Sequence, residues 1–172
     1  VKRCGPTGKV TRHAKQTGFV RLSSGRTTLI MDCATPVTPI PENSASLASF
    51  ELHLAGTPFI VNPGQLSEEK FVNSAFCQTA AHTALTLDNL NNCFSSGDNY
   101  DLVRALEIGP ATGGMLVHLA HDGYINSHGI VHERHVYLTT GGGNIRGSDT
   151  LRYTGGPGEI PKTCIIRFHL HP

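Results

Sequence analysis

The sequence has few charged residues and few aromatic ones. Only 16% of its 172 residues are Asp, Glu, Lys or Arg, the formal net charge is +1, and there is no Trp. A near-neutral chain lacks the basic excess typical of nucleic-acid-binding proteins, and its 38% hydrophobic content argues against disorder. No apolar run reaches the roughly 18 to 20 residues that a membrane span requires. We therefore expect one globular domain, with no nucleic-acid partner and no membrane span.

Closely spaced cysteine pairs are also lacking. The five cysteines contain no C-x-x-C motif, and an odd number leaves at least one thiol without an intramolecular partner. This spacing supports neither a disulfide framework nor a cysteine-based zinc site. We expect mainly reduced thiols that pack as small apolar side chains. The cysteines leave the cellular compartment open.

Turn-forming residues are abundant, with 19 Gly and 10 Pro. They separate short β-rich runs at 18–22, 27–32, 47–54, 59–64, 102–108, 115–120 and 130–139. We expect hairpins around the loop at 23–26 and around 56–58, and a turn at the glycines 141–143. Residues 67–76 are the one helix candidate. The predicted fold is all-β, an antiparallel β-sandwich of distorted jelly-roll type with little helix.

Several histidines are candidates for a functional site. His82 lies among small residues in 80–87, which we interpret as a strand, and is the best single candidate. His132 and His135 are three residues apart, so on a strand they point to opposite faces. His169 and His171 are two apart and share a face, which permits a common metal ion. We interpret Asp122-Gly123 first as a turn.

Ten segments carry a resemblance that extends over nearly the whole chain. Those in the last third include His-Asp-Gly-Tyr at 121–124, Gly-Ile-Val-His-Glu-Arg at 129–134 and Arg-Phe-His-Leu-His-Pro at 167–172, and earlier ones include Ser-Phe-Glu-Leu at 49–52 and Ala-His-Thr-Ala-Leu at 81–85. In their order and spacing they resemble the C-terminal β-domain of bacterial heparinase II/III-like proteins.

The resemblance implies that residues 1–172 are one β-sandwich domain. In a longer protein it would pack against an N-terminal helical (α/α) toroid, with a uronate-containing polysaccharide in the cleft between them. The chemistry implied is β-elimination, in which a base removes the proton beside the carboxylate and an acid protonates the leaving glycosidic oxygen. The cleft residues that we expect from this chain are His82, His121, Tyr124 and His132.

Some members of that family hold zinc in this domain with two histidines and an aspartate. His82 matches one of the histidines, whereas Asn62 stands at the aspartate position and Ser44 at that of the other histidine. An amide and a hydroxyl are poor neutral replacements for a carboxylate and an imidazole on zinc. We therefore predict no firmly held cofactor, and at most weak zinc binding through His82.

Two functions from different classes remain open. The domain is either one wall of a polysaccharide lyase cleft, inactive in isolation, or a non-catalytic carbohydrate-binding or structural sandwich. The second reading is favoured by Ser44 in place of histidine and by the absence of Trp for stacking on sugars. The resemblance points to a bacterial protein of the periplasm or cytoplasm, and a homo-oligomer is compatible with the sequence.

Overall fold

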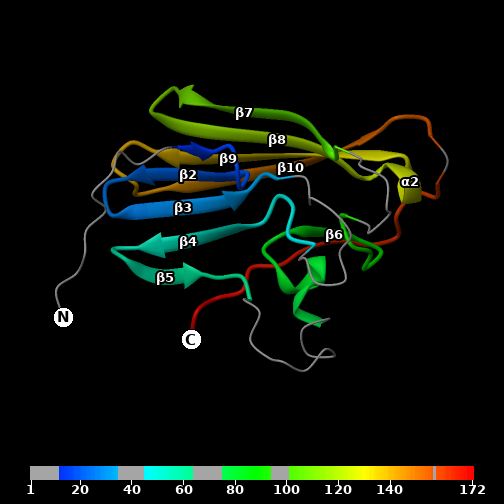
Figure 1. Cartoon of the computed structure of the whole chain (residues 1–172), viewed down its shortest axis with the longest axis horizontal. Coiled ribbons are helices and arrows are strands. Elements are labelled where there is room, and N and C mark those ends of the chain that lie inside the picture. Colours follow the sequence, from blue (N-terminus) through cyan, green and yellow to red (C-terminus); the bar gives the residue numbers. More distant parts are fainter. Residues whose placement is uncertain (1–11, 35–44, 64–74, 94–100, 157) are drawn as a thin grey trace.

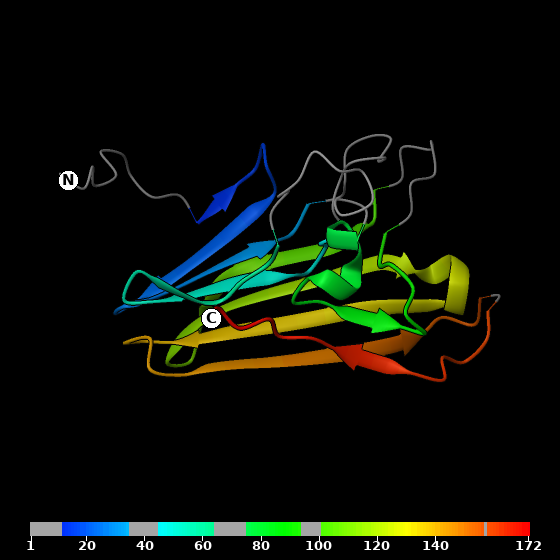
Figure 2. The same ribbon diagram turned by 90° about the horizontal axis from the view of Figure 1, so that it is seen from below.

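Two antiparallel β-sheets stack face to face, with a two-stranded sheet at one end (Figures 1 and 2). This computed structural model describes residues 12–34, 45–63, 75–93, 101–156 and 158–172. The predicted all-β sandwich is confirmed. Most of the helix candidate at 67–76, together with Ser44, lies outside the described residues. No helix among those residues is long and apolar enough to cross a bilayer.

The first sheet has the strand order β1-β2-β3-β4-β5. Its strands are β1 (His13–Ala14), β2 (Phe19–Ser24), β3 (Thr27–Asp32), β4 (Phe50–Leu54) and β5 (Thr57–Ile60). Alternate side chains of β3 are buried, as expected for a strand with one face on the core. Both hairpins predicted in this half, β2–β3 and β4–β5, form.

The second sheet has the order β10-β9-β8-β7. Its strands are β7 (Val103–Ala111), β8 (Gly114–Tyr124), β9 (Ile130–Thr139) and β10 (Ile145–Tyr153), and a short helix α2 (Ile125–His128) joins β8 to β9. The glycine turn at 141–143 joins β9 to β10 as predicted. It also contacts the β2–β3 turn, because Thr27 Oγ1 donates to the Gly142 carbonyl (2.7 Å) and Gly141 N–H donates to Ser24 Oγ (2.9 Å). These bonds tie the two sheets together at one end.

The turn predicted at Asp122-Gly123 is wrong. β8 continues through it to Tyr124, with a bulge between His121 and Tyr124 that shifts the register with β9. A Cβ added at Gly123 would lie 1.8 Å from the Asn92 carbonyl oxygen. The glycine is therefore required for the close approach of another backbone segment.

The strand predicted over 80–87 is only partly present. Residues 79–81 form a 3-10 turn, η1 (Thr79–Ala81), and only β6 (Leu85–Leu87) is extended, paired with β11 (Cys164–Ile166). Asn91 Oδ1 accepts the Thr79 N–H and Thr79 Oγ1 donates to the Ala45 carbonyl, so side chains capture the backbone groups that a longer strand would pair. His82 therefore lies on an irregular segment.

The hydrophobic core fills the space between the two sheets. Its buried members come from β2, β3, β4, β8 and β9 and include Val20, Leu22, Leu29, Met31, Leu52, Val117, Leu119, Val136 and Leu138. A smaller cluster of Leu85, Leu87, Tyr124 and Ile130 lies between β6 and the α2 end of the second sheet. Cys33 and Cys93 are buried thiols whose burial raises their pKa, that of Cys93 to about 12. Such thiols are unreactive, as predicted for cysteines that only pack.

Candidate functional site

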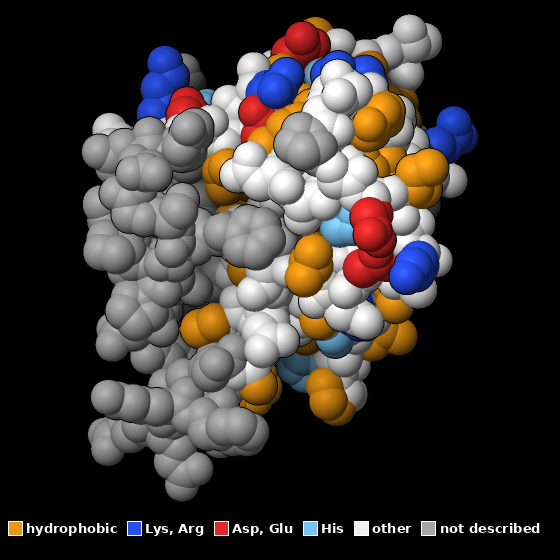
Figure 3. All heavy atoms as spheres, turned by 90° about the vertical axis from the view of Figure 1, so that its right-hand side faces the viewer, with side chains coloured by type: hydrophobic (Ala, Val, Ile, Leu, Met, Phe, Trp, Pro, Cys, Tyr) orange, Lys and Arg blue, Asp and Glu red, His pale blue; other side chains and the backbone are white. Residues whose placement is uncertain are grey.

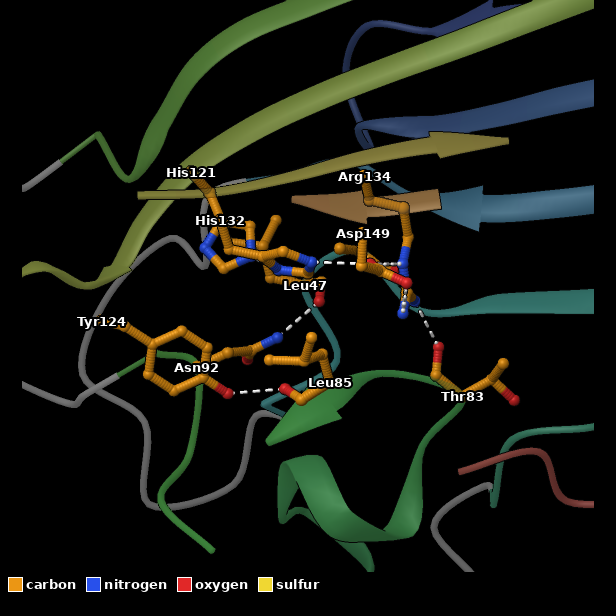
Figure 4. Close-up of polar contacts among 10 residues, drawn as sticks. Leu47, Thr83, Leu85, Asn92, His121, Tyr124, His132, Arg134 and Asp149 are labelled. Carbon is orange, nitrogen blue, oxygen red and sulfur yellow. Dashed lines mark hydrogen bonds and ion pairs between the residues drawn. The ribbon is translucent and has the colours of Figure 1, made fainter. Parts of the chain in front are cut away.

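Two buried histidines form a directed chain of hydrogen bonds at the start of β9 (Figure 4). The Gly123 N–H donates to His121 Nδ1 (3.1 Å), so the His121 proton is on Nε2. His121 Nε2 then donates to His132 Nδ1 (2.8 Å), and His132 Nε2 donates to Asp149 Oδ1 (2.6 Å). Every ring nitrogen has a partner, and both imidazoles are neutral in this arrangement.

Asp149 and Arg134 form the charged end of the chain. Arg134 Nε donates to Asp149 Oδ1 (2.6 Å) and its second terminal nitrogen to Oδ2 (3.2 Å), which is a bidentate pair. Arg134 is 2% exposed, so its charge needs this carboxylate. Although burial raises the pKa of Asp149, the hydrogen bonds from His132 and Arg134 outweigh that effect and lower it to about 2.

Burial sets the protonation of the two histidines. It lowers the pKa of His121 far below the ordinary value, and the positive charge of Arg134 acts in the same direction. It also lowers the pKa of His132, and the hydrogen bond to Asp149 offsets part of this effect. Both rings therefore stay neutral near pH 7, in agreement with the hydrogen-bond directions.

Arg134 also fixes two loops that are far apart in sequence. Its first terminal nitrogen donates to the carbonyls of Ala48 and Thr83, each at 2.8 Å. Ala48 has a positive φ of 67°, a conformation that costs about 1 kcal/mol or more for a residue with a Cβ. The bond from Arg134 helps to hold it. The buried network thus sets the position of the segment that directly follows His82.

Tyr124 is fully buried, and its hydroxyl group links two parts of the fold. Its hydroxyl donates to the Leu85 carbonyl at 2.6 Å, which joins β8 to β6 (Figure 4). Nearby, the Asn92 side chain donates to the Leu47 carbonyl and its backbone N–H donates to Thr79 Oγ1. These bonds hold the loops packed beneath the second sheet.

His82 lies close to this network but outside the hydrogen-bonded chain. It is 2% exposed, and its Nδ1 donates to the Gln78 carbonyl at 2.8 Å. Burial lowers its pKa, and the hydrogen bond to Gln78 offsets part of the effect. The next residue, Thr83, donates its N–H to Asn62 Oδ1 at 2.8 Å.

The amide of Asn62 has structural partners on both sides. Its oxygen accepts from Thr83, and its nitrogen lies 3.4 Å from Ser49 Oγ. Asn62 therefore holds the segment after β5 against the residue next to His82 and the start of β4. The C-terminal segment reaches the same place, because Val61 N–H donates to the His169 carbonyl (2.9 Å).

The described residues around His82 do not form a zinc site. Within the described ranges, no three His, Cys, Asp or Glu side chains are grouped to hold a metal. Asn62, the second predicted ligand, uses its amide oxygen for a backbone N–H, and the position of Ser44 is not described. His169 has a buried Nε2 with no hydrogen-bond partner in the described chain, whereas His171 Nδ1 donates to the Pro172 carbonyl.

The structure brings three of the four predicted cleft residues together. His121, His132 and Tyr124 are each 0% exposed and adjoin one another, and His82 is linked to them through Thr83 and Arg134. Their catalytic role stays a prediction, but their polar atoms bind other parts of this chain. Sequence reasoning assigned no role to Arg134 or Asp149. The alternation of side chains along β9 could have revealed them, because it places Arg134 on the buried face with His132 and Val136. A buried guanidinium requires an acidic partner.

On the described part of the surface at the α2 and β6 end, acidic and basic side chains are scattered among hydrophobic and uncharged ones (Figure 3). Those described residues form no basic patch for a polyanion.

The packed antiparallel sheets and the buried polar network between them define an all-β sandwich domain. The family model described as heparinase II/III-like, C-terminal matches residues 6–172, so the chain belongs to the heparinase II/III-like C-terminal domain family. No curated protein matches the sequence.

Solved structures with this fold include heparinases. A mutant of the heparan sulfate lyase HepC from Pedobacter heparinus aligns with 79% of this chain at a TM-score of 0.59 and 18% identity. The heparinase III described as the BT4657 gene product aligns with 86% at a TM-score of 0.59 and 18% identity. The chain covers only 21% and 22% of these structures. At this identity the likeness shows the fold alone.

Proposed function

We propose that this domain is one wall of the polysaccharide cleft of a lyase, whose other wall is an N-terminal helical domain of the same protein. The proposal is supported by the family and by the small share of the heparinase structures that the chain covers. The substrate class proposed is a uronate-containing polysaccharide. Elimination needs a base, an acid and a group that neutralises the carboxylate around one sugar, each within about 3 Å of its target. One wall cannot supply all three.

The observation that carries the proposal is the convergence of three segments near His82. Arg134 fixes the loop at Ala48 and the residue after His82, and Asn62 joins the same two regions from the end of β5. A rigid framework beneath a site is what precise positioning of substrate requires. We propose that the half-buried Asn62 marks the part of the domain that faces the cleft.

A second candidate function is a non-catalytic structural or binding domain. It is favoured by the burial of His121, Tyr124 and His132, whose polar atoms are bonded within the chain. In that case the buried network serves folding alone, and neither the isolated domain nor the longer protein eliminates uronate polymers.

The ultraviolet absorbance of unsaturated uronates separates these functions. The isolated domain and the full-length protein are assayed in parallel on heparan-type, alginate and related polymers. We expect activity in the full-length protein only, reduced by Asn62→Ala and unchanged by the control His53→Ala on β4. Activity in the isolated domain would refute the divided site. A folded full-length protein inactive on every polymer would favour the non-catalytic domain, and an unaffected Asn62→Ala would show that this residue does not face the cleft.

A further inference from the structure

A second histidine pair lies on the outer face of the second sheet, away from the buried network. His118 on β8 and His135 on β9 are directly opposite each other in the antiparallel register. Their rings are stacked, with centroids 4.2 Å apart and planes 2° from parallel. Opposed side chains of an antiparallel pair have Cβ atoms about 5 Å apart, within reach of a shared ligand.

A carboxylate completes the cluster. Glu133 Oε2 lies 3.8 Å from His118 Nε2, while its other oxygen accepts from Arg152 Nε at 3.1 Å. A gap of 3.8 Å is too long for a hydrogen bond. Two ligand atoms that each lie about 2 Å from one tetrahedral ion are about 3.3 Å apart, so Glu133 would have to move closer by about half an ångström.

The side chain of His118 has a buried nitrogen atom that makes no hydrogen bond within the described part of the chain. Its Nε2 is buried and has no hydrogen-bond partner, although the whole side chain is 17% exposed. Burying a polar nitrogen without a partner is unfavourable. A cation at Nε2 would satisfy this atom, provided that the nitrogen carries no proton.

We propose that His118 and His135 form a chelating site for a late first-row divalent ion, such as Zn²⁺ or Ni²⁺. Imidazole suits these ions, and Glu133 supplies a carboxylate oxygen beside them. No three ligands are already grouped among the residues that the structure describes. The His135 ring must therefore turn about its Cβ–Cγ bond, a broad torsion, and water fills the remaining positions.

The test is titration with Zn²⁺ and Ni²⁺ by calorimetry, after alkylation of accessible thiols. We expect one site. His118→Gln and His135→Gln should each weaken it by roughly tenfold or more, because one of two imidazole ligands is lost. The double variant should bind no more weakly than either single one, because a chelate fails when one ligand is removed. The matched control is His53→Gln, since His53 Nε2 also lies near a carboxylate, 3.7 Å from Glu51 Oε2, without an opposed histidine.

Three results would overturn the proposal. They are unchanged affinity in either single variant, losses that add in the double variant as for independent sites, and a loss in His53→Gln equal to that in His135→Gln. Broadening of histidine ring signals by Ni²⁺ gives a second readout. It should affect His118 and His135 first, and broadening confined to His169 and His171 would place the ion at the C-terminus instead.

Discussion

His121 Nε2 donates a hydrogen bond to His132 Nδ1 across 2.8 Å, between two neighbouring strands inside the sandwich. The bond is directional because the Gly123 N–H fixes the proton of His121 on the nitrogen that faces His132. Two neutral imidazoles thus connect a backbone amide to the Asp149 carboxylate. Such a fully satisfied polar chain specifies one packing of β8, β9 and β10.

Removal of the Asp149 charge should strongly destabilise the domain. In Asp149→Asn the Arg134 guanidinium stays buried without its carboxylate, which should cost about 3 to 5 kcal/mol of unfolding free energy. The control is Asp122→Asn, which removes the more exposed pair with Arg104 and should cost about 1 kcal/mol or less. Urea unfolding measures both. Equal losses would contradict the role assigned to the buried pair.

Stability should fall as the pH is lowered through about 6.5. Unfolded histidine titrates near that value, whereas burial lowers the pKa of His82, His121 and His132 in the folded chain. Below pH 6.5 the unfolded chain therefore binds more protons than the folded one, and stability falls by at most about 1.4 kcal/mol per pH unit for each histidine. Urea unfolding from pH 8 to pH 5 checks the slope. A flat profile would contradict neutral buried rings.

Tyr124→Phe should cost about 1 to 2 kcal/mol, because the Leu85 carbonyl loses a buried donor. Tyr153→Phe is the control, since that side chain is 60% exposed and its hydroxyl bonds only to the nearby Gly156 carbonyl. Thermal unfolding compares them. If the full-length protein is a lyase, loss of activity in the folded Tyr124→Phe variant would support the catalytic role predicted for Tyr124, and full activity below the unfolding temperature would count against it.

Gly123→Ala should destabilise by about 2 kcal/mol or more, because a Cβ would meet the Asn92 carbonyl oxygen at 1.8 Å and the backbone must move. Gly109→Ala on β7 is the control, as nothing lies within 4 Å of the added atom. It should change stability by about 0.5 kcal/mol or less. Denaturant unfolding measures the free energy of unfolding of both variants. Similar losses in the two would show that the loop at Asn92 can move away from an added Cβ at little cost.

Local pattern determined much of the fold. The alternation of residues in β3 and β9 and the glycines at 141–143 predicted strands and a turn at the right places, because period 2 and positive φ depend on neighbouring residues only. The same reasoning failed where contacts with residues distant in sequence determine the backbone conformation. Thr79 forms hydrogen bonds with the Asn91 side chain and the Ala45 carbonyl, and these distant partners stabilise the turn at 79–81. Gly123 leaves room for the backbone at Asn92, which lies against the bulge in β8. Neither feature could be predicted from neighbouring residues.

The candidate site divides in the same way. The sequence by itself selected His82, His121, Tyr124 and His132, and the spacing of His132 and His135 predicted that the two point to opposite faces of a strand, which the structure confirms. Only the tertiary structure decided that His121 and His132 bond to each other, and that Arg134 joins Asp149 to two loops 86 and 51 residues away. The physical reason is that burial and partners determine what an imidazole does. Both are set by segments that meet when the two sheets pack, and they leave no pattern within any one segment.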